Sequence, residues 1–165
     1  MRRLAFACGL WLAFCGPTLA HRAPNSVVRV EFGTDRVHAE VMVPRSELAH
    51  AMAGPQDANA FSAYLLRHIC AETPEGVRWN VRVQSVRDKR YVDHDYLLAQ
   101  LELVPPRGAQ LGRFMLIDDA VTHEVRNHVV WVVTRQDDAL IGSLQYPQSR
   151  IAIERPAAAR TSAGR

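Results

Sequence analysis

The chain has 165 residues, enough for one domain but too few for two of ordinary size. Hydrophobic residues make up 48% and charged residues 22%, which excludes both a disordered chain and an unbroken membrane bundle. The formal net charge is +3, but two of the 20 basic residues, Arg2 and Arg3, lie in a segment predicted to be removed. Without that segment the chain has 18 basic and 17 acidic residues, so its net charge gives no support to a nucleic-acid partner.

Residues 1–20 have the organisation of a secretory signal peptide. Two arginines precede an apolar run of 11 residues, 4–14, and small residues follow at Thr18 and Ala20. The apolar run is shorter than the ~20 residues of a permanent membrane span. Cleavage after Ala20 predicts a periplasmic or otherwise extracytoplasmic protein that begins at His21 and has no membrane span.

Two alternatives apply to the same segment. It could be a buried N-terminal helix, or Cys15 could be a lipidation site. A lipidation signal needs a small residue before the cysteine, and Phe14 is large and aromatic. We therefore favour cleavage at Ala20 over lipidation at Cys15.

The predicted elements that follow are mostly strands. Period-two alternation of apolar residues predicts a hairpin over 28–32 and 37–43, then strands over 77–83, 97–103, 114–116, 121–134, 141–146 and 151–153. Ser46 and Asp57 are predicted to cap two short helices within residues 46–71, and the charged run 87–90 is predicted to be a turn. Trp79 and Trp131 fall on the apolar faces of their strands, so we expect both to be buried.

This pattern predicts a mainly β domain over residues 21–155. The expected architecture is an antiparallel β-sandwich of about seven or eight strands with a short helical insertion. Residues 156–165 contain only Ala, Arg, Ser, Thr, Gly and Pro, so a disordered tail is expected there.

The common catalytic motifs are absent from the sequence. It contains no GxSxG, P-loop, GxGxxG, CxxC or HExxH pattern. The adjacent acids at 118–119 and 137–138 would point to opposite faces of a strand, which suits an acid/base pair poorly. The chain is therefore predicted not to be an enzyme, and a small hydrolase with an unrecognised site is the alternative.

Histidines are the most informative residues. Cleavage would make His21 the first residue, so its α-amino group and imidazole could chelate one metal ion. Nitrogen pairs of this kind suit copper(II) or nickel(II). The alternative is that cleavage simply leaves a histidine at this position.

A second group of candidate metal ligands comprises Asp119, His123 and His128. Asp119 and His123 would share a face of an unbroken strand because their spacing is four, whereas His128 would face the other way. A bulge near 126–127 would let the two imidazoles converge. The other interpretation makes His123 a hydrogen-bonded core residue between Val121 and Val125.

Several short motifs in order resemble one family. They are the start at 21–28, the helix entry Val43-Pro44-Arg45-Ser46-Glu47-Leu48, the segments 119–125 and 127–130, and the end at 151–155. Together they resemble the soluble extracytoplasmic region of HupE/UreJ-type membrane proteins. That family is linked by name to hydrogenase and urease accessory functions and hence to nickel. Its membrane helices have no counterpart before Arg165, so the resemblance does not imply transport by this chain.

Two functions follow as expectations. The first is an exported accessory or binding domain that docks on a membrane-protein partner. The alternative is a soluble periplasmic domain that binds nickel or copper through His21 together with His123 or His128. The sequence leaves the choice between them open.

Overall fold

The computed structural model describes residues 24–156, which form a mainly β domain with nine strands in two sheets and two short helices. The larger sheet contains β4 (Asn80–Tyr91), β5 (His94–Val104), β2 (Val37–Pro44), β1 (Ser26–Phe32), β7 (Val130–Thr134) and β8 (Leu140–Leu144), in that order. The smaller sheet contains β3 (Ile69–Glu72), β6 (Arg113–Asp118) and β9 (Arg150–Glu154). The helices are α1 (Arg45–Ala51) and α2 (Ala58–His68). The prediction of a mainly β fold is confirmed. The predicted signal peptide and almost all of the predicted tail lie outside the described residues.

The predicted hairpin forms the centre of the larger sheet. Its apolar positions pair across the two strands, with Val28 of β1 opposite Val41 of β2. On its other side β1 runs parallel to β7, with Ser26 beside Val130. The sheet is therefore mixed, and the prediction of an antiparallel arrangement is wrong for this pair. Alternation of apolar residues determines which face a strand buries, but it does not determine the direction of the neighbouring strand.

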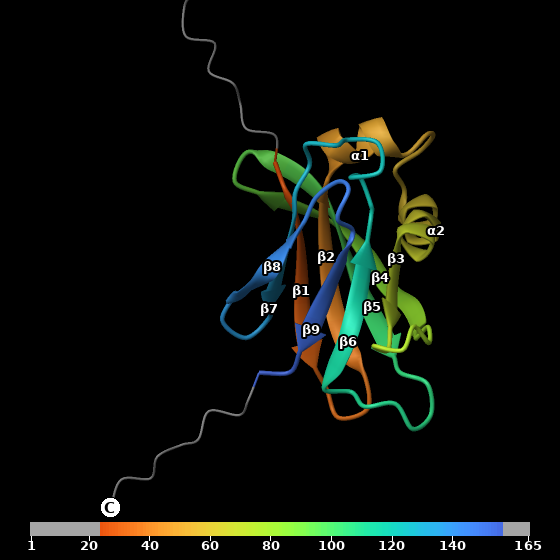
Figure 1. The fold of residues 1–165 in the computed structure, drawn as a ribbon. Coiled ribbons are helices and arrows are strands. Elements are labelled where there is room, and N and C mark those ends of the chain that lie inside the picture. Colours follow the sequence, from red (N-terminus) through yellow and green to blue (C-terminus); the bar gives the residue numbers. More distant parts are fainter. Residues whose placement is uncertain (1–23, 157–165) are drawn as a thin grey trace, which may run out of the picture.

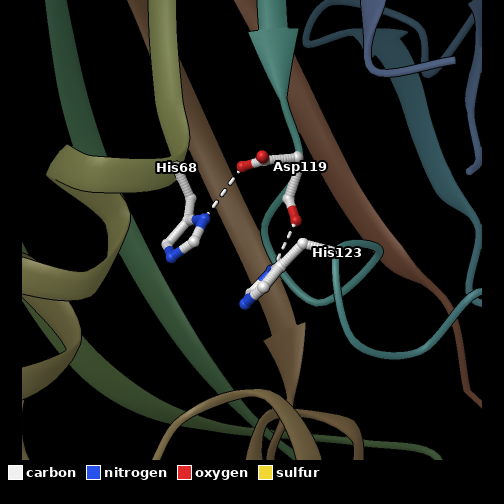
Figure 2. Close-up of side chains that lie close together, drawn as sticks. All are labelled: His68, Asp119 and His123. Atoms are coloured by element: carbon white, nitrogen blue, oxygen red, sulfur yellow. Dashed lines mark hydrogen bonds and ion pairs between the residues drawn. The ribbon is translucent and has the colours of Figure 1, made fainter. Parts of the chain in front are cut away.

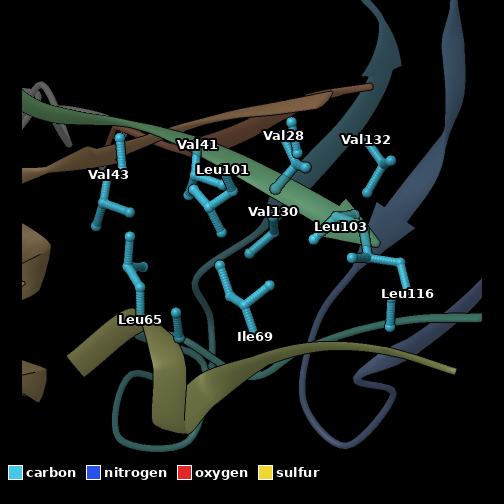
Figure 3. Packing of buried hydrophobic residues seen from close by; sticks show 14 of the residues in the cluster. Val28, Val41, Val43, Leu65, Ile69, Leu101, Leu103, Leu116, Val130 and Val132 are labelled. Carbon is cyan, nitrogen blue, oxygen red and sulfur yellow. The ribbon is translucent and has the colours of Figure 1, made fainter. Parts of the chain in front are cut away.

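The smaller sheet covers one face of the larger one, as Figure 1 shows. A single hydrophobic cluster includes residues from both sheets. In Figure 3, Val28, Val41 and Leu101 of the larger sheet point toward Ile69 and Leu116 of the smaller one. All five side chains are buried, so this contact between layers is the main hydrophobic core.

The two tryptophans differ in burial. Trp79 is buried and its ring centroid lies 4.8 Å from that of Phe114. Trp131 is 37% exposed, while its neighbours Val130 and Val132 are fully buried. The predicted inward orientation of Trp131 is therefore wrong. The chain before β7 forms turns and not a continuous strand, so β7 takes its own register and turns the two valines inward.

The helices begin and end differently from the prediction. α1 begins at Arg45, directly after β2, so the predicted cap Ser46 lies inside the helix. Asp57 caps α2 as expected, because its carboxylate accepts two backbone N–H groups of the first turn at 2.9 Å. α2 ends at His68, three residues earlier than predicted, because residues 69–72 pair with β6. Neither helix of the described range is long and apolar enough to cross a bilayer.

The charged run 87–90 lies inside β4, and the turn of this hairpin falls at Val92 and Asp93. The predicted turn over 87–90 is therefore wrong. β4 is one of the two edge strands of the larger sheet, and charged side chains are typical of edge strands because they discourage pairing with another chain. The same charge run is therefore compatible with either a turn or an edge strand.

Candidate metal site

Three side chains of metal-ligand type come together at one end of the smaller sheet. They are His68, Asp119 and His123, and one ligand atom from each lies within 4.8 Å of the others. Figure 2 shows them converging from the end of α2, the end of β6 and the turn that follows β6. All three side chains are partly exposed, so the group lies at the surface and not in the core.

The pairing of two strands places His68 beside Asp119. β3 follows α2 without a loop, and its first residue, Ile69, lies opposite Asp118 at the end of β6. One further backbone hydrogen bond continues this ladder, because the N–H of Asp119 donates to the carbonyl of His68 at 3.2 Å. The last residue of the helix and the first residue after the strand are therefore held opposite each other.

A helical turn brings His123 to the same place. The backbone N–H of His123 donates to the carbonyl of Asp119 at 3.1 Å, and that of Val125 donates to Val121 at 2.8 Å. The strand predicted over 121–134 is therefore wrong for residues 121–129. Asp119 and His123 nevertheless lie together, because residues four apart also share one face of a helical turn.

Two buried polar groups hold this turn in shape. The carboxylate of Asp118 accepts the backbone N–H of Ala120 at 2.9 Å, and the hydroxyl of Tyr64 accepts that of Val121 at 2.8 Å. Val121 has a φ of 66°, a strained conformation for a β-branched residue. Burial raises the pKa of Asp118 to about 7 and that of Tyr64 to about 12. The strained turn that carries His123 thus depends on hydrogen bonds from the core.

Aromatic contacts orient the two imidazoles. The rings of His68 and His123 are stacked, with centroids 4.2 Å apart and an interplanar angle of 17°. Tyr64 lies beside them, its centroid 4.4 Å from that of His68. These contacts restrict the orientation of both rings.

Asp119 contacts both rings. Its carboxylate Oδ1 lies 2.8 Å from Nδ1 of His68, and its backbone carbonyl oxygen lies 2.9 Å from Nδ1 of His123. Imidazole nitrogens suit zinc, copper and nickel, whereas magnesium and calcium prefer oxygen ligands. The donor set therefore fits a transition-metal ion of borderline softness.

The structure places His128 elsewhere, in a buried cluster with Ser26 and Glu47. Nε2 of His128 lies 2.8 Å from Oγ of Ser26, and Nδ1 lies 3.8 Å from Oε2 of Glu47, too far for a hydrogen bond. Burial lowers the pKa of His128 to about 4, so the ring is neutral at pH 7. His128 is not part of the three-residue group, and the bulge that would have joined it to His123 does not form.

The serine–histidine contact in this cluster is enclosed by the protein. Ser26 is 2% exposed, so substrate has no route to its hydroxyl in this conformation. Nδ1 of His128 has no hydrogen-bond partner within the described chain, whereas a catalytic imidazole is oriented by such a bond. The cluster is therefore a packed part of the core.

The remaining predicted ligand, His21, lies outside the described residues. The sequence does not single out His68 as a ligand, because it falls on the apolar stripe of α2 with Phe61, Tyr64 and Leu65. The local feature that points to His68 as a ligand is its position as the last helical residue before a strand. That signal becomes informative only when β3 is known to pair with β6.

The chain matches no protein-family model, and no curated protein gives a significant match.

Proposed function

We propose that the chain is an exported, non-enzymatic accessory domain that binds a divalent transition-metal ion through the group formed by His68, Asp119 and His123. The observation that supports this proposal is the convergence of three ligand-type side chains within 4.8 Å at a partly exposed surface. Three separate elements of the chain supply them, and backbone hydrogen bonds hold those elements together. The proposal is therefore the metal-binding alternative that the sequence predicts, with His68 as a ligand in place of His21 and His128.

Two further expectations belong to this proposal. The resemblance to the extracytoplasmic region of HupE/UreJ-type membrane proteins supports nickel as the ion and a membrane-protein partner as the docking site. The predicted signal peptide supports a periplasmic location. We also propose that the two facing sheets are a variant of the β-sandwich in which β7 has joined the larger sheet in parallel.

Calorimetric titration of the purified chain with nickel(II), copper(II) and zinc(II) tests the proposal. We expect one ion per chain and loss of that binding in the double variant His68→Ala/His123→Ala. His94→Ala is the matched control, because His94 is an exposed histidine at a distant hairpin. It should bind as the wild type does.

Chemical unfolding provides a second readout of the same binding. An ion that binds only the folded chain, present at 100 times its dissociation constant, raises the free energy of unfolding by about 2.7 kcal/mol. We expect this increase in the wild type and in His94→Ala, but not in the double variant. Equal binding by the double variant and the wild type would refute the proposed site. If adding one residue before His21 of the cleaved chain abolishes binding, the result would instead support the N-terminal chelate.

A further inference from the structure

We infer that Asp119 is a positioning residue, and that the Nε2 atoms of His68 and His123 are the atoms that bind the ion. In this arrangement Asp119 holds both imidazoles by their Nδ1 atoms, one through its side chain and the other through its backbone. The inference rests on the proposed function and specifies its ligands. The ion class is zinc(II), nickel(II) or copper(II), with the other coordination positions open to water or to a ligand from a partner.

The contact with His123 determines which nitrogen of that ring carries the proton. Nδ1 lies 2.9 Å from the backbone carbonyl oxygen of Asp119. A carbonyl oxygen only accepts hydrogen bonds, so Nδ1 must be the donor. In the neutral ring Nε2 therefore holds the lone pair that a metal ion needs.

The contact with His68 leads to the same tautomer. Nδ1 lies 2.8 Å from Oδ1 of Asp119, the length of a hydrogen bond to a carboxylate. Two ligand atoms at bond lengths of about 2.0–2.1 Å in a tetrahedral zinc site would be about 3.3 Å apart. The shorter distance indicates a proton between the two atoms, so Nε2 is again the nitrogen with the lone pair.

The two Nε2 atoms lie on the same side of the group. Figure 2 shows both rings with Nδ1 toward Asp119 and the other ring nitrogen directed away from it. The rings are nearly parallel and their centroids are 4.2 Å apart, so the two Nε2 lone pairs run side by side. The rings must tilt toward each other for both lone pairs to reach one ion. Metal-binding histidines generally donate their second N–H to a carboxylate or a backbone carbonyl, and here one residue provides both acceptors.

Nuclear magnetic resonance of the ¹⁵N-labelled chain tests the inference, with zinc(II) as the probe because it is diamagnetic. Before zinc is added, we expect His68 and His123 in the Nδ1–H form. Added zinc should then shift the Nε2 signals of both rings while both Nδ1 atoms keep their protons. A zinc-induced shift at Nδ1 of His68 would overturn the inference and leave the proposed function standing. No change in either ring at any zinc concentration, together with no binding of nickel(II) or copper(II) in the calorimetric titration, would overturn both.

Substitutions of Asp119 separate positioning from direct binding. Asp119→Asn retains an oxygen that can accept the proton of His68, and it leaves the backbone carbonyl unchanged. We expect it to weaken zinc binding less than about tenfold, whereas Asp119→Ala should weaken it about 10- to 100-fold. Asp93→Asn, at an exposed hairpin turn, is the matched control and should have no effect. If Asp119→Asn abolishes binding as fully as His68→Ala does, the carboxylate is a ligand and the inference is wrong.

Discussion

The two histidine clusters of this protein place the same side chain in opposite environments. His68 and His123 are partly exposed, stacked on each other and hydrogen-bonded through Nδ1 to Asp119. The ring of His128 is fully enclosed, its pKa is lowered to about 4, and among the described residues it has a hydrogen bond at Nε2 but none at Nδ1. The rings of His68 and His123 are therefore both oriented and accessible to solvent, whereas the ring of His128 is inaccessible.

The difference shows what makes a histidine available for chemistry. Burial alone removes the charge of His128 but also removes any route for a ligand, so this ring contributes packing and a hydrogen bond. Partial exposure leaves His68 and His123 in contact with solvent, and the two hydrogen bonds to Asp119 hold them in one orientation. The contrast between the two clusters should be visible in the free energy of unfolding.

His128→Ala should lower the free energy of unfolding by about 2–5 kcal/mol, because it leaves a cavity in the core and deprives buried Ser26 of its partner. Urea unfolding of the metal-free chain measures the effect. A loss below 1 kcal/mol would show that the cluster of His128, Ser26 and Glu47 is not packed as the structure has it.

Acidification should destabilise the fold through His128. In the unfolded chain this ring takes up a proton near pH 6.5, whereas in the folded chain it does so only near pH 4. The unfolded state therefore binds more protons between these values, and stability falls as the pH falls. Between pH 6.5 and pH 4 this effect lowers the free energy of unfolding by about 3 kcal/mol, because a pKa difference of one between the two states corresponds to 1.36 kcal/mol.

The comparison of wild type with His128→Asn isolates this effect. It is needed because the raised pKa of Asp118, about 7, acts in the opposite direction: the folded chain keeps that proton as the pH rises, so Asp118 favours folding at low pH. Urea unfolding of both proteins from pH 7 to pH 4 should show their stability difference narrowing toward low pH. A difference that stays constant would mean that His128 is not buried in its neutral form.

Tyr64→Phe should lower the free energy of unfolding by about 1–3 kcal/mol, because it leaves the buried N–H of Val121 without its acceptor. The strained turn that carries His123 should loosen, so amide hydrogen exchange should increase over residues 119–125. Tyr96→Phe is the control, since Tyr96 packs in a separate cluster with Met42 and Leu98. Equal effects of the two substitutions would argue against a specific role for the Tyr64 hydroxyl.

His68→Ala should change the stability of the metal-free chain by less than about 1 kcal/mol, because its side chain is partly exposed and does not fill the core. Urea unfolding without metal provides the measurement. A loss as large as that of His128→Ala would make His68 a structural residue and remove the contrast between the two clusters.

Part of the candidate site could be predicted from local spacing. Asp119 and His123 are four residues apart, and this spacing puts two side chains on one face both of a strand and of a helical turn. Only in the turn are they close, because four residues of a strand span about 13 Å. The sequence predicts a strand and the structure has a turn, so the shared face could be predicted but the contact between the two residues could not. His128 was different, because its approach to His123 required a bulge that the turn at residues 121–129 replaces.

The sequence by itself determined the apolar alternation of the strands, the hairpin of β1 and β2 and the capping of α2 by Asp57, since each depends on residues close together in the chain. Only the tertiary structure decided that β1 is parallel to β7, that Trp131 faces outward and that His68 meets Asp119. These features depend on which strands pair. Strand pairing joins residues far apart in the sequence, and it follows from the packing of the whole core and not from any local pattern.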